Sequence, residues 1–394
     1  MAAIYFESYE RAKQLLKRAL QRRTKGEKDM KSKKFVFYVS SLSKGGAQRV
    51  ILNLTESLLK KGHHVVIVTT MVCQPEYDLP EGARRIFSDI TEEETTTNRV
   101  INFIRRFRKL RNIWKNERPD VLVSFIGKNN FMAILTAWGL KIPVVTSVRG
   151  EPNAEYYDKM QQILAKTLMG KADGLILQTP DAKAYFPKWI QKKAVILENP
   201  INPLFIDDYY EGPRKNEIVT VGRLDSNKNQ KLIIDAFCQI AGDFPEVNLI
   251  LYGSGEDHDK LIEYAQKTPY KNQIFLPGPI RNVKTRIEKS KIFVLSSNTE
   301  GMPNSLMEAL ALGIPSISTD CPCGGPRMLM EGKENGILVP VGEAEPMAKA
   351  MRKLLTDEAL WEKYSRNAYK ITEELHPDKV NQKWENYLLS KMKH

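Results

Sequence analysis

Short apolar runs alternate with helix-length amphipathic segments along almost the whole chain. Such alternation is the pattern of βα units, and repeated units form parallel sheets covered by helices on both faces. The runs that we interpret as strands fall into two sets, at 35–39, 65–69, 121–125, 144–147, 174–177 and 194–197, and at 218–221, 247–252, 273–276, 292–295, 316–318 and 336–339. The sequence therefore predicts an α/β fold with two doubly wound, Rossmann-like parallel-sheet domains.

A stretch dotted with Pro and Gly separates the two sets of strands. It runs from Glu198 to Pro213 and has no periodicity, which is typical of a connection between domains. The predicted segments are a basic N-terminal extension at 1–34, a first domain at 35–200, a linker at 201–214, a second domain at 215–375 and a terminal helix at 376–394 that packs back towards the first domain. Ligands of doubly wound sheets bind beyond the carboxyl ends of the strands, so we expect the site in a cleft between the domains.

The charge of the chain is unevenly distributed. Of its 394 residues, 60 are Lys or Arg and 47 are Asp or Glu, which gives a net charge of +13. Residues 1–200 hold 35 Lys and Arg against 20 Asp and Glu, a net +15, whereas residues 201–394 hold 25 against 27, a net −2. We therefore expect the first half to face an anionic partner such as a membrane surface, a phosphorylated acceptor or nucleic acid.

Several features favour a cytoplasmic protein. No apolar run reaches the ~20 residues that span a bilayer, and no apolar segment with a cleavage site stands at the start of the sequence. The four cysteines are too scattered for a disulfide framework. The pair in Cys321-Pro-Cys323 has no nearby Cys or His that would complete a set of metal ligands, and we predict that the protein needs no metal.

Two basic amphipathic segments are candidates for contact with a membrane. Residues 5–19 place apolar side chains at helical spacing among Lys and Arg. Residues 99–115 combine Phe103, Phe107 and Trp114 with six Arg and Lys between positions 105 and 115. Helices of this composition can lie on an anionic membrane surface, or they can pack their apolar face on the protein. The sequence favours contact with the membrane for residues 1–24, and it leaves both interpretations open for residues 99–115.

The segment from Glu300 to Glu308 is the main candidate for a binding site. It follows the predicted strand at 292–295 and leads into a short helix, with Pro303 suited to the first helical position and Gly313 to the stop. The N–H groups at a helix start favour an anion such as a diphosphate. One carboxylate precedes the helix and the other lies within it, so the segment can contact two parts of a phosphorylated ligand.

Glycines and cations follow the first strand of each domain. Gly45 and Gly46 open the helix after the first strand, and paired glycines let the backbone approach a ligand closely, although a tight turn without a ligand is the alternative. In the second domain Gly222 ends a strand, and Arg223 and Lys228 follow it. A guanidinium and an ammonium at a strand end suit a diphosphate and can neutralise it without a metal ion.

Together these motifs resemble glycosyltransferase family 4, whose members have the GT-B fold. The motifs are Gly45-Gly46, Gly222-Arg-Leu with Lys228-Asn229, the Glu300 and Glu308 pair, Gly313-Ile-Pro, Asp320-Cys-Pro-Cys-Gly-Gly-Pro and Glu334-Asn-Gly. The resemblance covers residues 35–390, is strongest in 216–345 and is to bacterial enzymes that build capsule, O-antigen and lipid-linked oligosaccharides. Many relatives have a His in a first-domain loop where this chain has Arg149 and Glu151, which are its candidates for the acceptor or sugar side.

The resemblance implies a role for each matching residue. Arg223 and Lys228 would bind the diphosphate of the donor. Glu308 would bind the ribose hydroxyls and Glu300 would lie at the sugar ring, so that the predicted catalytic residues are Glu300, Arg223 and Lys228. The predicted donor-binding residues are Gly46, Gly222, Arg223, Lys228, Ile280, Arg281, Glu300, Gly301, Met302, Pro303, Asn304, Ser305 and Glu308.

The resemblance also implies an activity. It predicts a hexosyltransferase that retains the anomeric configuration, needs no metal or other cofactor, and moves a hexose or N-acetylhexosamine from a UDP-sugar to a membrane-associated, lipid-linked saccharide. The protein would be cytoplasmic and peripheral on the inner face of the cell membrane, with no nucleic-acid partner. The alternatives are a GDP-mannose-dependent mannosyltransferase or a nucleotide-sugar epimerase of the same fold, and a basic binding protein without enzyme activity.

Overall fold

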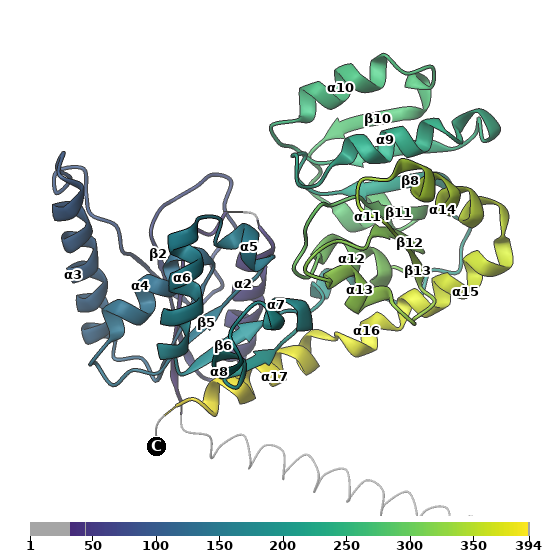
Figure 1. Cartoon of the computed structure of the whole chain (residues 1–394). Helices are drawn as coiled ribbons and strands as arrows, with labels where there is room; N and C mark the ends of the chain where they lie inside the picture. Colours follow the sequence, from purple (N-terminus) through teal and green to yellow (C-terminus); the bar gives the residue numbers. More distant parts are fainter. Residues whose placement is uncertain (1–31, 44, 393–394) are drawn as a thin grey trace, which may run out of the picture.

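The computed structural model describes residues 32–43 and 45–392. They form two α/β domains that lie side by side (Figure 1). The predicted basic helix at residues 5–19 lies outside the described residues. None of the described helices is both long and apolar enough to cross a membrane.

A seven-stranded parallel sheet forms the centre of the first domain. Its strands follow the order β3-β2-β1-β4-β5-β6-β7. Their bounds are β1 Lys34–Val39, β2 His64–Thr69, β3 Arg84–Phe87, β4 Val121–Phe125, β5 Val144–Ser147, β6 Gly174–Leu177 and β7 Ala194–Ile196. Helices cover both faces of this sheet, so its central strands are buried on both sides and consist of nearly continuous Val, Ile, Leu and Phe.

The second domain repeats this plan with a six-stranded parallel sheet in the order β10-β9-β8-β11-β12-β13. The bounds are β8 Lys215–Val221, β9 Asn248–Tyr252, β10 Ile274–Gly278, β11 Ser290–Leu295, β12 Ser316–Thr319 and β13 Gly336–Val339. In both sheets the first strand lies in the interior and the strand order reverses beside it. This is the arrangement of doubly wound folds, and it confirms the predicted fold class.

Helices connect the strands on both faces of each sheet. In the first domain they are α2 Gly46–Lys60, α3 Arg99–Glu117, α4 Gly127–Ala137, α5 Pro152–Glu155, α6 Lys159–Leu168, η1 Met169–Lys171, α7 Pro180–Ala184 and α8 Lys188–Gln191. After η2 Pro203–Phe205 come α9 Gln230–Cys238, η3 Ala241–Asp243, α10 His258–Gln266, η4 Lys271–Gln273, α11 Val283–Ile287, α12 Asn304–Ala311, α13 Gly325–Met330, α14 Ala344–Thr356, α15 Glu358–Tyr369, α16 Ile371–Glu374 and α17 Pro377–Leu389.

The edge strand β3 was missed by the sequence analysis. It has only four residues, and two of them are arginines that form ion pairs, Arg84 with Glu117 and Arg85 with Glu76. A strand at the edge of a sheet is half solvated and tolerates charge, so it lacks the continuous apolar run by which the other strands were found.

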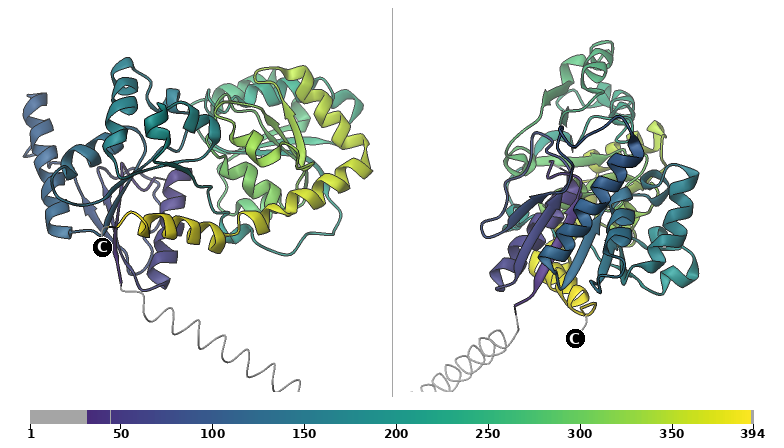
Figure 2. Two further views of the ribbon diagram at one scale, coloured as in Figure 1. Left: turned by 60° about the horizontal axis from the view of Figure 1, so that its bottom comes forward. Right: turned by 90° about the vertical axis from the view of Figure 1, so that its left-hand side faces the viewer.

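The last helix, α17, crosses from the second domain back to the first and packs against α2 (Figure 2). The indole ring of Trp384 is buried and stacks on Phe125 at 6.0 Å between ring centroids, while its Nε1 donates to the carbonyl of Glu198 at 3.0 Å. Beside it Glu385 accepts from Lys61 and pairs with buried His63 at 3.1 Å. The C-terminal helix thus fastens the second domain to the first.

Helix α3 is packed on the protein at one end and exposed at the other. Asn98 caps its start by accepting from the N–H groups of Val100 and Ile101. Leu110 and Trp114, in the C-terminal half, are buried against the first sheet, whereas Phe103 and its apolar neighbours in the N-terminal half are exposed. The helix therefore packs on the protein by one end and presents an apolar surface at the other.

We predict that Trp384→Ala lowers the free energy of unfolding by ~3–5 kcal/mol, because it removes a fully buried indole and leaves a cavity between the domains. Urea denaturation followed by far-UV circular dichroism measures this change. The control is Trp138→Ala, whose side chain is 61% exposed and whose loss should change stability by less than about 0.5 kcal/mol. Equal effects of the two substitutions would contradict the role given to α17.

Candidate active site

The candidate site lies where the strand order of each sheet reverses. In the second sheet this point is between β8 and β11, which are followed by Gly222 and Glu300 respectively. In the first sheet it is between β1 and β4, which lead to Gly46 and Gly127 at the starts of α2 and α4. Doubly wound sheets bind ligands at such switch points, at the carboxyl ends of their strands.

Helix α12 carries one of the two predicted carboxylates and starts beside the other. Pro303 is the N-cap and the helix begins at Asn304, so the prediction that Pro303 holds the first helical position was wrong by one residue. Gly313 lies just beyond the end of the helix with φ +65°, a conformation that favours glycine. The helix buries its apolar face and with it Glu308, which is only 5% exposed.

Glu300 and Lys228 form an ion pair in the site. Ser297 Oγ donates to the same carboxylate oxygen, Oε1, at 2.6 Å. The Lys228 backbone is fixed by its N–H, which donates to Asp225 Oδ1 at 2.9 Å. Both members of the ion pair are largely buried, so the structure brings two of the three predicted catalytic residues into direct contact.

Arg223, the third predicted catalytic residue, lies at the rim of the site. Its side chain is 73% exposed and pairs with Asp225 Oδ2 at 3.2 Å. Asp225 thus contacts the side chain of one predicted diphosphate-binding cation and the backbone of the other. The long, exposed side chain of Arg223 can fold onto a ligand in the cleft, whereas the side chain of Lys228 already lies in the cleft.

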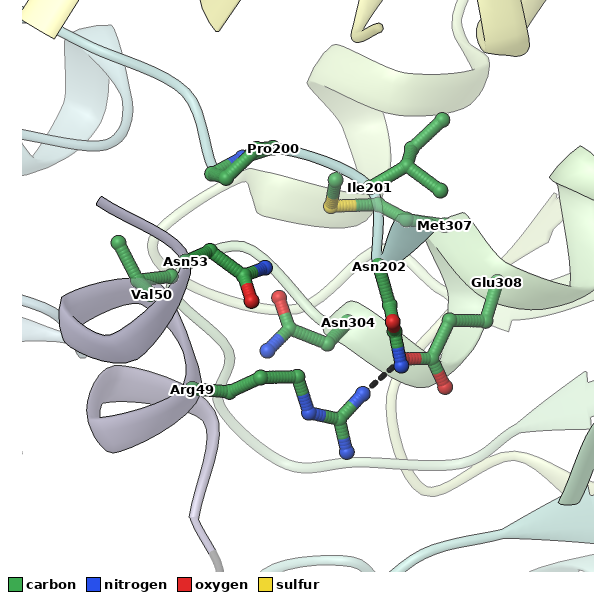
Figure 3. Close-up of a pocket in the computed structure, with 9 residues that line it drawn as sticks. All are labelled: Arg49, Val50, Asn53, Pro200, Ile201, Asn202, Asn304, Met307 and Glu308. Carbon is green, nitrogen blue, oxygen red and sulfur yellow. Dashed lines mark hydrogen bonds and ion pairs between the residues drawn. The ribbon is translucent and has the colours of Figure 1, made fainter. Parts of the chain in front are cut away.

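Glu308 pairs with Arg49 of helix α2, across the gap between the domains (Figure 3). The Arg49 guanidinium also donates through Nε to the hydroxyl of Tyr77 at 3.2 Å. Burial raises the pKa of the Glu308 carboxyl to about 6, against the opposing effect of Arg49. Arg49 is one helical turn beyond the predicted Gly46, but the sequence analysis did not include it.

Glycines allow the two domains to touch at this site. A Cβ on Gly46 would lie 3.0 Å from Asn304 Nδ2, which donates to the Gly46 carbonyl at 3.4 Å. A Cβ on Gly301 would lie 2.3 Å from the Arg149 carbonyl oxygen. A side chain at Gly301 would collide with the backbone of the other domain, whereas one at Gly46 would displace only the Asn304 side chain. Gly301 therefore permits a close contact between the domains as well as a turn.

The N–H groups at the start of α12 are not all directed to the cleft. Met302 N–H donates to Gln178 Oε1 at 3.3 Å, and Pro303 has no N–H. Asn199, in the connection between the domains (the hinge, 198–213), donates to the Met302 carbonyl at 3.2 Å and to Asn304 Oδ1 at 2.7 Å. Of the predicted segment, Asn304 and Ser305 are the more accessible residues, while Gly301 and Met302 are buried.

Three predicted donor-binding residues lie on the other loops of the second domain. Gly222 directly follows β8, and its carbonyl oxygen would be only 1.8 Å from a Cβ on Gly253. Ile280 and Arg281 lie in the loop after β10; Ile280 packs against the core, whereas Arg281 is exposed.

Arg149 and Glu151, the candidates to replace the family His, have structural partners. The Arg149 guanidinium donates to Asn199 and lies 5.3 Å from the ring centroid of Trp384. Its burial lowers its pKa to about 9. Glu151 caps α5 by accepting from the N–H of Ala154 at 2.7 Å. The Arg149 side chain therefore points into the seam between the domains, and it is its backbone that faces Gly301.

Glu155 is a further residue that the sequence analysis missed. Its carboxylate accepts from the N–H of Gly127 at 2.6 Å and from the N–H of Arg149 at 3.1 Å, so it joins the loops that follow β4 and β5. Burial raises its pKa. Nothing in the local sequence distinguishes this acid from a surface residue, because its partners come from distant segments.

In the parts of the chain that the structure describes, no three His, Cys, Asp or Glu side chains are grouped so that they could hold a metal ion. The cations that the structure places at the site are those of Lys228, Arg223 and Arg49. Positive charge for an anionic ligand is therefore available from side chains.

Two families of known proteins match the two domains. Residues 44–203 match the family described as Glycosyltransferase Family 4, and residues 206–371 match the family described as Glycosyl transferases group 1. The paired Rossmann-like sheets and these matches define a glycosyltransferase of the GT-B class. The chain belongs to glycosyltransferase family 4, as its motifs predicted.

Two similar proteins come from Campylobacter jejuni. One is named GalNAc-alpha-(1->4)-GalNAc-alpha-(1->3)-diNAcBac-PP-undecaprenol alpha-1,4-N-acetyl-D-galactosaminyltransferase; it is 26% identical over 357 residues, which cover 89% of this chain and 97% of the relative. The other is named N-acetylgalactosamine-N,N'-diacetylbacillosaminyl-diphospho-undecaprenol 4-alpha-N-acetylgalactosaminyltransferase and is 26% identical over 353 residues, or 85% of this chain and 93% of the relative.

Solved structures share the fold. HepE of Anabaena, solved in complex with UDP-glucose, superposes with a TM-score of 0.75 at 16% identity and covers 91% of this chain and 100% of its own. TarM superposes with a TM-score of 0.75 at 14% identity, over 91% of this chain and 99% of its own. At this level of identity the superpositions support the GT-B architecture.

The raised pKa of Glu308 predicts how a substitution depends on pH. A carboxyl whose pKa is raised in the folded protein destabilises the fold when ionised, and this cost is relieved as the pH falls through the folded pKa of about 6. The change in stability caused by Glu308→Gln should therefore be more favourable at pH 7.5 than at pH 5, whatever the loss of the ion pair with Arg49 costs at both values. Urea denaturation at both values measures the difference. An effect that is the same at both, or larger at pH 5, would contradict the assignment.

Proposed function

We propose that the protein is a retaining, metal-independent glycosyltransferase that moves a hexose or N-acetylhexosamine from a UDP-sugar to a hydroxyl group of a lipid-linked saccharide. The observation that carries the proposal is the contact between Lys228 and Glu300 beside the start of α12, with Glu308 further along the same helix. The site thereby offers a cation for a diphosphate and two carboxylates for hydroxyl groups.

The charged side chains of the site suggest where each chemical group of the donor would bind. The diphosphate would lie at Lys228, with Arg223 folding over it from the rim. The buried carboxylate of Glu308 would accept hydrogen bonds from the ribose hydroxyls, and Glu300 would face the sugar ring. The complex of HepE with UDP-glucose supports a UDP-sugar as donor, because that protein shares the fold over 91% of this chain.

The reaction would proceed on one face of the sugar. The bond between the anomeric carbon and the diphosphate oxygen breaks while the acceptor oxygen forms its bond to the same carbon. The leaving diphosphate takes the proton of the acceptor hydroxyl. Lys228 and Arg223 stabilise the charge that develops on the diphosphate, in place of a metal ion. Glu300, held by Lys228 and Ser297, stabilises the positive charge that develops on the sugar ring.

The acceptor would bind from the first domain. The two relatives from Campylobacter jejuni bear names that specify undecaprenol-linked acceptors. Residues 1–200 of this chain carry a net charge of +15, with 35 Lys and Arg against 20 Asp and Glu, which suits the diphosphate of a lipid-linked saccharide and the anionic surface in which it is anchored.

An exposed apolar surface on the first domain would contact the membrane. Phe103 in α3 and Met160 and Ile163 in α6 are each more than half exposed, and both helices pack against α4 (Figure 1). The exposed cations Arg108 and Lys159 lie on the same two helices. A surface that combines apolar and basic side chains suits a peripheral protein on the cytoplasmic, anionic leaflet.

The direct test incubates the purified protein with UDP-glucose, UDP-galactose, their N-acetylamino forms and GDP-mannose, each with and without an undecaprenyl-diphosphate-linked oligosaccharide. We expect UDP release that requires the acceptor, and a product whose new bond keeps the anomeric configuration of the donor. If GDP-mannose is the one donor that the protein turns over, the donor is GDP-mannose and not a UDP-sugar. A changed nucleotide sugar formed without acceptor would indicate an epimerase, and no binding of any donor would refute the proposal.

We predict that Lys228→Ala lowers kcat by about 10²–10³-fold, because the leaving diphosphate loses the cation that stabilises it in the transition state. Steady-state kinetics with the donor identified by the screen measures the loss. Lys231→Ala is a matched control, since this lysine pairs with Asp235 on the exposed face of α9 and should leave kcat unchanged. Similar kcat values for the two variants would contradict the role of Lys228.

If the exposed surface of α3 contacts the membrane, a substitution there should weaken binding to lipid vesicles. Phe103→Ser should lower binding to vesicles of phosphatidylglycerol and phosphatidylcholine by about tenfold. Full transfer of a Phe side chain from water contributes ~1.5–3 kcal/mol, and the Phe103 side chain is 51% exposed, so about half of this is gained on the membrane. Co-sedimentation with vesicles measures the partition coefficient. Phe275→Ser, at an exposed Phe of the second domain, is the matched control and should bind as the wild type does. Equal binding of all three proteins would contradict a membrane surface on α3.

A further inference from the structure

The ion pair between Arg49 and Glu308 joins the two domains inside the candidate donor site. Arg49 lies on the first turn of α2, directly after the Gly45 and Gly46 loop, and Glu308 lies on α12. Figure 3 shows the Arg49 side chain extended from α2 toward Glu308, with Asn304 beside it. Its guanidinium therefore occupies the space in front of the carboxylate that we assign to the ribose.

The two partners differ in burial. The Glu308 side chain is 7% exposed and that of Arg49 is 30% exposed, so the acid is fixed within its domain and the base reaches it from the solvent side. Arg49 is also held by Tyr77, from its own domain. A charge pair that is partly removed from water is screened less by solvent and salt than an exposed surface pair.

A nucleotide that binds Glu308 competes with this pair for space. The carboxylate can accept about four hydrogen bonds, so its lone pairs alone do not exclude the guanidinium. However, the Glu308 side chain is only 7% exposed, and Arg49 contacts its Oε1 from the solvent side. A ribose that approaches this carboxylate must therefore enter the space that the guanidinium occupies.

We propose that Arg49 is a positioning residue that couples donor binding to the contact between the domains. In the donor-free protein its guanidinium holds Glu308 and ties α2 to α12. The ribose hydroxyls of the nucleotide displace it and release this tie. The inference rests on the proposed function, because it takes the ligand of Glu308 to be a nucleotide.

Binding measurements on Arg49→Gln test the competition. Isothermal titration calorimetry with UDP should show a Kd about three- to tenfold lower than that of the wild type, because a site that is no longer occupied by Arg49 is available in a larger fraction of molecules. Inorganic diphosphate lacks the ribose, so its Kd should stay the same. Unchanged UDP affinity would overturn the proposal. Weaker binding of both ligands would show instead that Arg49 binds the diphosphate.

The tie between the domains is tested without any nucleotide. Small-angle X-ray scattering of the donor-free proteins should give a larger radius of gyration for Arg49→Gln than for the wild type. Arg327→Gln is the control, because Arg327 also forms an ion pair across the domains, with Asp181 at 3.3 Å, but on the exposed rim. An unchanged radius in Arg49→Gln, or an equal increase in both variants, would overturn the tie.

These two measurements separate the inference from the proposed function. If the wild type binds no UDP, the proposed function fails, and the scattering result still decides whether Arg49 ties the domains. Should Arg49→Gln not fold, Arg49→Lys serves in both experiments. It keeps the charge but loses the planar fork, so it should give intermediate values, and values equal to the wild type would count against the proposal.

Discussion

The structure depends on the return of α17 to the first domain. Two doubly wound sheets can bind a shared ligand only when their carboxyl edges face each other, and a flexible hinge alone does not impose this orientation. Trp384 does so by stacking on Phe125 and bonding to the hinge, while Arg149 lies beside both rings. Because the edges are held in this way, Gly46 of one domain can meet Asn304 of the other.

Charge balance is the second constraint on the site. Two carboxylates at the start of a helix would repel a diphosphate if they were unpaired. Each has a cation, but from a different place: Lys228 pairs with Glu300 within the second domain, whereas Arg49 reaches Glu308 from the first. The first pair is preserved in any arrangement of the domains. The second joins the two domains, so it depends on how they are arranged.

Much of the fold could be predicted from the sequence, because central strands of parallel sheets are buried on both faces and show continuous apolar runs. Strand β3 could not be predicted in this way. It lies at the edge of the sheet, and its two arginines interrupt the apolar run that identifies a buried strand. The roles of Glu300, Lys228 and Glu308 came from the family motif and remain predictions. Arg49 and Glu155 were missed because their partners come from segments that are distant in the sequence. The spacing of residues along the chain does not show which distant segments pack together.

The central claim is that one nucleotide is bound by Lys228 and Glu308 together. A crystal structure of the protein with UDP measures this most directly. We predict that the ribose hydroxyls lie within ~3.2 Å of the Glu308 carboxylate and that a diphosphate oxygen lies at a similar distance from Lys228 Nζ. UDP bound elsewhere in the cleft, or with its ribose turned away from Glu308, would contradict the account.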